Sequence, residues 1–133
     1  MGLSRMPGGY TCIGDTQFLP GYRVLNSDSP ANRLSDLPLP ERTQFLADMS
    51  LLGEAIMTAG APLRINYSLH GTTYHFLHAH VIPRCDLEDA ERVKMPVWLY
   101  PPEWWNRPDI AYSGRRRGAM SERVRLALTE LMG

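Results

Sequence analysis

The stretch that decides the fold is YHFLHAHVIPR, residues 74–84. Its apolar residues predict a β-strand over residues 74–82, and His78 and His80 stand two positions apart within it. Because side chains alternate along a strand, the two imidazoles share one face and lie roughly 6–7 Å apart along it. The opposite face is small and aliphatic, which suits packing against a helix, and it consists of Leu77, Ala79 and Val81.

Spacing alone leaves three interpretations of this histidine pair open. A neutral imidazole can attack a phosphoryl or acyl centre while its neighbour orients it or assists proton transfer. Two strand histidines can instead ligate zinc, with a third ligand drawn from elsewhere, and His70 and His75 are the remaining histidines. Finally, both rings can be partly buried, hydrogen-bonded groups without a chemical role. A short His motif does not choose among the three.

The residues around this strand predict an antiparallel α+β domain. Residues 63–69 alternate apolar and polar side chains, which indicates a half-buried strand that pairs with residues 74–82 about the turn HGTT. Two short strands are predicted at Tyr10–Ile13 and Tyr22–Leu25, separated by turn residues. The first dozen residues, rich in Gly and Pro, are expected to be loose.

Two amphipathic helices are predicted from their apolar spacing. Residues 40–59 carry one apolar face, formed by Phe45, Met49, Leu52 and Ile56. A second helix begins at Ser121 as N-cap, and its apolar face consists of Val124, Leu128 and Leu131. The segment between Arg84 and this helix is expected to be loop-like, including the basic run GRRRG at 114–118.

Composition restricts the class of protein. A chain of 133 residues predicts one domain over 1–133, with a core at about 10–85 and a tail with a terminal helix at 86–133. The 14 basic and 14 acidic residues balance, so net charge favours neither nucleic acid nor a membrane surface as partner. No apolar stretch approaches the ~20 residues of a membrane span. Two distant cysteines without a CxxC motif indicate a reduced, cytoplasmic protein.

The segment RINYSLHGTTYHFLHAHVIPR, residues 64–84, resembles the signature of the histidine triad family of nucleotide hydrolases and transferases. The resemblance continues in collinear order through DTQFLPGYRVL, LSDLPLPERTQFLADMSLLGEA and PVWLYPPEWW, the last being similar to the aromatic tail of a bacterial branch. It implies a histidine triad fold, in which an antiparallel sheet is backed by the 40–59 helix, and a homodimer. In such a dimer the tryptophans of the tail, Trp98, Trp104 and Trp105, would pack at the interface or stack on a base.

The resemblance also implies roles for both histidines. His78 matches the family's nucleophile, which attacks the α-phosphorus of a nucleotide and forms a nucleotidyl-histidine that water cleaves. His80 matches the supporting imidazole of the phosphate site. The first triad position is Phe76 rather than His, and alternation directs His75 to the other face. Bacterial relatives also look to have a first position other than His with LHAH retained. The family's early His, expected near residues 29–37, has no counterpart here.

Substrate contacts follow from the same resemblance. Asn66 matches the strand Asn that approaches the phosphates, and Thr72 stands where the family often has Gln or Asn. Asp15 matches the acidic residue that binds the ribose, although Gly14 can take that place and Asp15 can serve as a turn residue. Arg84 follows the motif and faces either phosphate or solvent.

The implied activity is hydrolysis or transfer at the α-phosphate of a nucleotide conjugate, either a dinucleoside polyphosphate or a nucleoside phosphoramidate. No cofactor is required, and Mg²⁺ can accompany a polyphosphate substrate. One alternative is a catalytically impaired nucleotide-binding protein of the same fold. The other is a zinc-binding HxH protein, whereas the hydrolase reading places no metal at the site.

Overall fold

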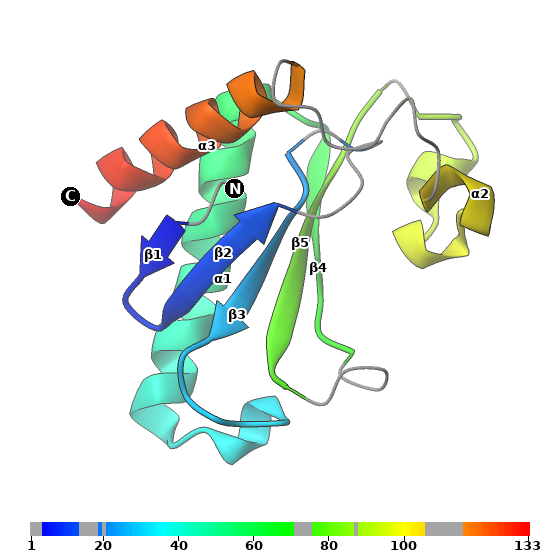
Figure 1. Ribbon diagram of the computed structural model, residues 1–133. Helices are drawn as coiled ribbons and strands as arrows, with labels where there is room; N and C mark the ends of the chain where they lie inside the picture. Colours follow the sequence, from blue (N-terminus) through cyan, green and yellow to red (C-terminus); the bar gives the residue numbers. More distant parts are fainter. Residues whose placement is uncertain (1–3, 14–18, 20, 71–75, 87, 106–115) are drawn as a thin grey trace.

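The computed structural model describes residues 4–13, 19, 21–70, 76–86, 88–105 and 116–133 (Figure 1). A five-stranded antiparallel sheet and one long helix form its centre. In chain order the elements are β1 (Ser4–Met6), β2 (Gly9–Ile13), β3 (Arg23–Ser27), a 3-10 turn (Leu34–Asp36), α1 (Leu39–Gly60), β4 (Arg64–Ser68), β5 (His78–Arg84), two further 3-10 turns (Arg92–Lys94 and Val97–Leu99), α2 (Pro102–Trp105) and α3 (Arg116–Met132).

The strand order is β1-β2-β3-β5-β4, with every neighbouring pair antiparallel. The predicted pairing of the 63–69 strand with the histidine strand is confirmed, because β4 lies beside β5 with Ser68 opposite His80. On the other side of β5, β3 places Asn26 opposite His78 and Val24 opposite His80. The histidine strand is therefore an inner strand of the sheet, supported on both sides.

The main core lies between the sheet and α1, which covers one face of the sheet in Figure 1. The predicted 40–59 helix is confirmed within a residue at each end, and Phe45, Leu52 and Ile56 are almost completely buried. The aliphatic face of β5 packs here as predicted, through Leu77, Ala79 and Val81. Full burial of one such large apolar side chain stabilises a fold by about 1.5–3 kcal/mol. The opposite face of β5, which carries the histidines, is thereby directed away from α1.

A second, smaller apolar cluster lies on the histidine face of the sheet. It joins Ile82 of β5 to residues that precede β3 and residues of the tail, namely Leu19, Tyr22, Val97 and Tyr100. Since a buried apolar contact removes surface from water at both partners, this cluster holds the 97–100 segment over the sheet. The tail thus forms one wall of the histidine face.

Two expectations about the ends of the chain are wrong. From Ser4 on, the first dozen residues are not loose, because β1 and β2 form a hairpin whose turn is bonded to α1 by Gly8 N–H donating to Asp48 Oδ2 at 2.7 Å. α3 begins at Arg116, so Ser121 lies inside the helix and Arg116–Gly118 are helical rather than loop. The hydroxyl of Ser121 accepts a hydrogen bond from buried Arg23 at 2.8 Å, and a hydroxyl used in this way does not cap a helix.

The predicted apolar face of the terminal helix is confirmed. Val124 and Leu128 are fully buried in the main core, and Leu131 packs against it. α3 crosses α1 on the side away from the sheet's histidine face (Figure 1). The terminal helix therefore completes the core around α1.

Candidate active site

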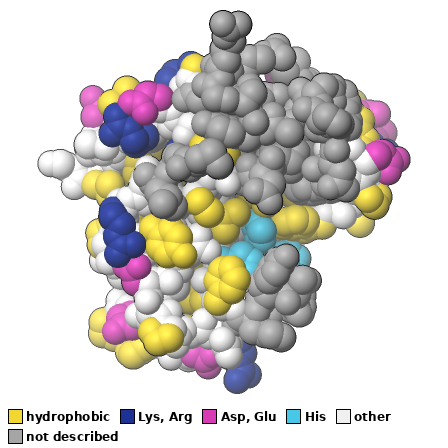
Figure 2. Space-filling view, in the orientation of Figure 1, with side chains coloured by type: hydrophobic (Ala, Val, Ile, Leu, Met, Phe, Trp, Pro, Cys, Tyr) yellow, Lys and Arg dark blue, Asp and Glu magenta, His cyan; other side chains and the backbone are white. Residues whose placement is uncertain are grey.

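His78 and His80 lie side by side on the face of β5 that points away from α1. Their ring centroids are 5.0 Å apart, and the rings meet edge to face at 75°. Figure 2 shows the histidine side chains as one patch on this face, bordered by hydrophobic side chains. Two imidazoles this close are useful only in a neutral or singly charged state, because two positive rings at this distance repel each other.

The ring of His78 is held by a backbone group. Its Nδ1 lies 2.8 Å from the carbonyl oxygen of Phe76, and the residue is 8% exposed. A carbonyl oxygen only accepts hydrogen bonds, so Nδ1 carries the proton and Nε2 of the neutral ring keeps its lone pair. The ring of Phe76 lies 4.7 Å from that of His78 and is itself half exposed. In its neutral form, His78 therefore presents an oriented Nε2 lone pair on the histidine face.

His80 is held by a side chain from the turn that precedes β3. Its Nδ1 lies 2.6 Å from the hydroxyl oxygen of Tyr22. Burial lowers the pKa of His80 to about 4, and the neighbouring imidazoles of His78 and His70 act in the same direction. At neutral pH His80 is consequently uncharged.

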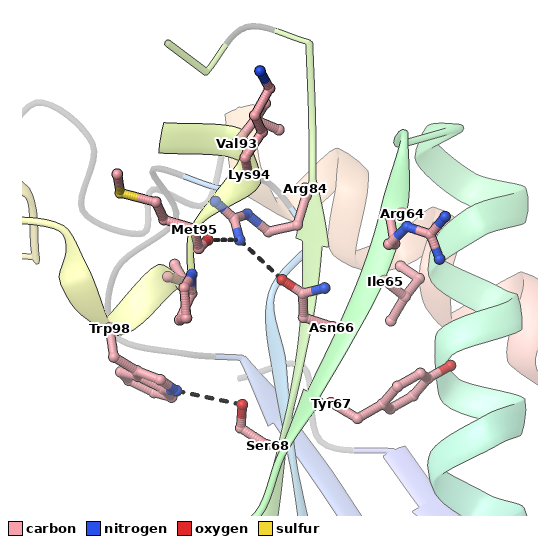
Figure 3. A pocket seen from close by; sticks show the side chains of 12 residues that line it. Arg64, Ile65, Asn66, Tyr67, Ser68, Arg84, Val93, Lys94, Met95 and Trp98 are labelled. Carbon is pink, nitrogen blue, oxygen red and sulfur yellow. Dashed lines mark hydrogen bonds between the residues drawn. The ribbon is translucent and has the colours of Figure 1, made fainter. Parts of the chain in front are cut away.

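Trp98 connects the tail to this pair. Its ring meets His80 edge-on at 4.8 Å and His70 at 5.2 Å. Its indole N–H donates to the hydroxyl of Ser68 at 3.3 Å, a contact drawn in Figure 3. Trp98 thus borders the histidines of its own chain, with its ring over the site.

Asn66 lies on β4 on the histidine face, and Arg84 fixes its orientation. The guanidinium of Arg84 donates to Oδ1 of Asn66 at 2.9 Å, as Figure 3 shows. Since a guanidinium has no acceptor, the amide oxygen must face it, and the amide NH₂ is turned the other way. Asn66 therefore offers donors, the polarity that a phosphate oxygen requires.

Arg84 itself is engaged by protein groups. It is 3% exposed, forms an ion pair with Glu88 at 2.8 Å, and donates to the backbone carbonyls of Arg92 and Met95. Together with the bond to Asn66, these contacts use all five of its N–H groups. The structure thus places Arg84 beneath the site, where it orients Asn66 and anchors the following segment, and no N–H group remains for a phosphate.

Glu88 completes this buried group. It also accepts hydrogen bonds from the hydroxyl of Tyr100 at 2.7 Å and from the backbone N–H of Cys85 at 2.9 Å. Burial alone would raise the pKa of Glu88, but the hydrogen bonds from Arg84, Tyr100 and Cys85 outweigh it and lower the pKa below its usual value. The carboxylate is therefore ionised and holds the 85–100 segment to the end of β5.

Among the described residues, two cavities border the histidine face of the sheet. One of about 290 Å³ contains His78 in its wall, together with Asn32, Arg33, Leu34, Leu69, His70, Phe76 and Leu77. The other, of about 760 Å³, extends along β4 to the tail and is drawn in Figure 3; Asn66, Ser68, Lys94 and Trp98 contribute to it. Ser68 and Trp98 also border His80, so the two spaces lie on either side of the histidine pair.

The structure brings together three of the six residues singled out from the sequence, His78, His80 and Asn66, and places Arg84 behind Asn66. Asp15 and Thr72 lie outside the described residues, as do Gly14 and His75. Sequence reasoning missed Tyr22 and Ser68 as neighbours of His80. The β4–β5 hairpin alone implies the position of Ser68, whereas Tyr22 depends on β3 lying beside β5, which no local pattern encodes.

Within the residues that the structure describes, no three His, Cys, Asp or Glu side chains are grouped so as to hold a metal ion. No described helix combines the length and apolar character needed to cross a membrane.

No protein-family model matches the chain, and no curated protein matches its sequence. Solved structures do match. A histidine triad protein from Bradyrhizobium japonicum is 18% identical and superposes with a TM-score of 0.79 over 94% of this chain and 87% of its own. One from Marinobacter aquaeolei is 20% identical, with a TM-score of 0.77 over 96% and 87%.

A third match is the diadenosine triphosphate hydrolase of Plasmodium falciparum, whose structure contains cyclomarin A. It is 14% identical, with a TM-score of 0.59 over 95% of this chain and 72% of its own. At these identities the likeness concerns the fold. The chain has the histidine triad fold, as expected from its sequence, and its histidine pair occupies an inner strand of that fold.

Proposed function

We propose that this chain is a member of the histidine triad family and that it hydrolyses or transfers the nucleotidyl group of a nucleotide conjugate. The bond cleaved joins the α-phosphorus to its leaving group, as in a dinucleoside polyphosphate or a nucleoside phosphoramidate. The fold supports this proposal, and so does the pair of imidazoles that hydrogen bonds orient on its sheet.

His78 is the nucleophile of the proposed reaction. The lone pair on Nε2 attacks the α-phosphorus, and the bond from phosphorus to the leaving oxygen or nitrogen breaks with its electron pair going to the leaving group. The ring becomes positively charged, and its Nδ1–H stays bonded to the carbonyl oxygen of Phe76, which stabilises that charge. Water then attacks the phosphorus, Nε2 departs with its electron pair, and a proton is released.

Donors on the same face bind the phosphate in this scheme. His80 and the amide of Asn66 donate to the non-bridging oxygens, where negative charge develops. We also propose that Thr72 contacts the phosphate and that Asp15 contacts the ribose. None of these steps calls for a metal ion, although Mg²⁺ can neutralise a polyphosphate leaving group.

The observation that carries the proposal is the hydrogen bond between Nδ1 of His78 and the carbonyl of Phe76, because it leaves Nε2 as the nucleophile. The test mixes the unmutated protein, His78→Ala and His80→Ala with an adenosine phosphoramidate and with a dinucleoside tetraphosphate. Intact mass and product release are followed in the same samples. We expect an adenylyl adduct and turnover in the unmutated protein, and neither in His78→Ala. Turnover that persists in His78→Ala would reject the assignment of His78 as the nucleophile.

A second function, nucleotide binding without turnover, is favoured by one observation. The first triad position is occupied by Phe76, whose aromatic side chain provides no hydrogen bond to a phosphate or leaving group. Titration calorimetry with AMP distinguishes the two functions. Binding with neither adduct nor turnover supports the second, and absence of binding rejects both.

We further propose a cytoplasmic homodimer. β4 is the last strand of the sheet, and exposed apolar side chains lie on it or next to its ends: Leu63, Tyr67 and Leu69. A strand edge with apolar neighbours suits antiparallel pairing with a second copy. Neither Cys12 nor Cys85 forms a disulfide within the described residues, which agrees with a reducing compartment.

A further inference from the structure

Tyr22 is a residue of the site to which the proposed reaction assigns no task. Its hydroxyl oxygen lies 2.6 Å from Nδ1 of His80, at the short end of the range for O–H hydrogen bonds. The side chain is 7% exposed. A buried phenol at such a distance constrains the imidazole that it meets.

The fold holds Tyr22 in place independently of His80. Its backbone N–H donates to the carbonyl of Leu19 at 3.2 Å and closes a turn in which Gly21 has φ +99°, a conformation that favours glycine. Its ring lies in the apolar cluster with Leu19, Ile82 and Val97. These contacts fix the position of the Tyr22 hydroxyl. The ring of His80 therefore takes the orientation in which its Nδ1 meets that hydroxyl.

The chemistry of the two groups sets the direction of the hydrogen bond. A phenol is a good donor, and the unprotonated nitrogen of an imidazole is a good acceptor. If Nδ1 accepts, the neutral ring carries its proton on Nε2. This tautomer is the opposite of that of His78, whose Nδ1 donates to a carbonyl.

We propose that Tyr22 is a positioning residue that donates its O–H to Nδ1 of His80 and thereby keeps His80 as a neutral hydrogen-bond donor through Nε2–H. The catalytic consequence rests on the proposed function. In that reaction His80 donates to a phosphate oxygen and does not act as a base. His78 supplies the attacking lone pair, and His80 supplies the N–H that binds the phosphate.

The surroundings of His80 favour the neutral ring. Among the described residues, the titratable groups that face it are Tyr22 just before β3, His78 on its own strand and His70 beyond the end of β4. Trp98 and Ser68 border it without charge. A proton on Nδ1 would end the acceptance from Tyr22 and place a positive charge between two other imidazoles.

The test compares three forms of the full chain labelled with ¹⁵N in its histidines: the unmutated protein, Tyr22→Phe and Tyr100→Phe. Tyr100→Phe is a matched control, because it removes a buried hydroxyl from the same apolar cluster but one bonded to Glu88. Long-range ¹H–¹⁵N spectra assign the proton to Nδ1 or Nε2 of each ring, and His80→Gln identifies the signals of His80.

In the unmutated protein at pH 7 we expect His80 to carry its proton on Nε2. In Tyr22→Phe we expect a mixture of tautomers and a higher pKa for His80, because the hydrogen bond that stabilises the neutral ring is lost. Tyr100→Phe should leave the His80 signals unchanged. A proton on Nδ1 in the unmutated protein would overturn the proposal without requiring any variant to fold. Identical His80 signals in Tyr22→Phe would also overturn it.

The rate of His78 adenylylation separates this inference from the proposed function. We expect Tyr22→Phe to lower it about 10- to 100-fold, as a misplaced group at a reacting centre does. The loss should shrink toward acidic pH, because the imidazolium of His80 carries Nε2–H with or without Tyr22. The Nε2–H tautomer together with no adduct in the unmutated protein would reject the function and leave the Tyr22–His80 pair standing. An adenylyl adduct together with a proton on Nδ1 of His80 would support the proposed function and reject the role of Tyr22.

Discussion

His78 and His80 occupy equivalent positions on one strand face, but different groups form the hydrogen bond that holds each ring. Both lie on one face of β5, yet Nδ1 of His78 meets a carbonyl, which can only accept, whereas Nδ1 of His80 meets a phenol. A neutral imidazole has one donor and one acceptor, so the partner at one nitrogen decides what the other presents. On a single strand, equivalent side chains can in this way take complementary roles toward one phosphate.

Phe76→His is the first prediction at this scale. The ring of Phe76 touches that of His78 and is half exposed, so an imidazole has both room and a polar environment there. We expect the substitution to raise kcat for an adenosine phosphoramidate by about tenfold or more, because the added group can assist the leaving atom. Phe76→Leu, which stays apolar, is the control. Equal rates in the two variants would show that the first position does not limit turnover.

Acid sensitivity is the second prediction. The pKa of His80 is lowered from 6.5 to about 4, so between these pH values the unfolded chain binds a proton that the folded chain does not. Stability therefore falls as pH drops from 6.5 toward 4, by roughly 1–2 kcal/mol after discounting for partial exposure of the ring. Urea unfolding at pH 7 and pH 4.5 measures the loss, and His80→Gln should reduce it. An undiminished loss in that variant would assign the effect to other groups.

At the scale of elements, the end of β5 and the tail depend on one buried ion pair. Arg84 and Glu88 are both almost completely buried, and their remaining hydrogen bonds reach Asn66, Tyr100 and three backbone groups. Besides this pair, the small apolar cluster and the hydrogen bond from Trp98 to Ser68 hold the tail segment 92–100 over the histidine face. The pair therefore couples the position of Asn66 to that of Trp98.

Glu88→Ala tests this coupling. It leaves a buried guanidinium without its carboxylate, and we expect a loss of about 3 kcal/mol in the free energy of unfolding. The pair Glu122–Arg125 is exposed on α3, so Glu122→Ala is a control that should change stability little. Urea unfolding of both variants measures the difference. Similar small losses would mean that the apolar cluster alone holds the tail.

At the scale of the whole molecule, the proposed dimer places a second copy at the edge of the sheet formed by β4. The sheet ends there, while α1 and α3 cover its other face and the tail covers part of the histidine face. Tyr67 is 44% exposed and Leu63 is 61% exposed beside this edge. Apolar surface of this kind favours an interface.

We expect light scattering to give twice the mass of a chain of 15.0 kDa. Leu63→Glu should shift the protein toward the monomer, because it places a charge at the proposed interface. Leu126→Glu, at an exposed position of α3 that is 52% accessible, should leave the mass unchanged. A monomer in the unmutated protein, or loss of the dimer only in Leu126→Glu, would reject the β4 edge as the interface.

The sequence by itself determined the long helix, the strand pair that carries the histidines and the face on which the histidines lie. The alternation in 63–69 and 74–82 and the helical spacing in 40–59 report directly which side chains are buried, because each regular backbone repeats with its own period. The start of α3 was not predictable in the same way. Ser121 has the chemistry of a cap, but its hydroxyl is used by Arg23, which is distant in sequence.

Only the tertiary structure decided the partners of the two histidines. Tyr22 reaches His80 because β3 lies beside β5, and Trp98 covers it because the tail packs on Ile82. The sequence allows Arg84, at the end of a strand, to face solvent. In the tertiary structure Glu88 and two backbone carbonyls enclose it. Strand order and tail position depend on the apolar surface buried by the whole chain. The local periodicity of the sequence does not encode strand order or tail position. The hydrogen-bond partner of each imidazole could therefore be known only from the tertiary structure.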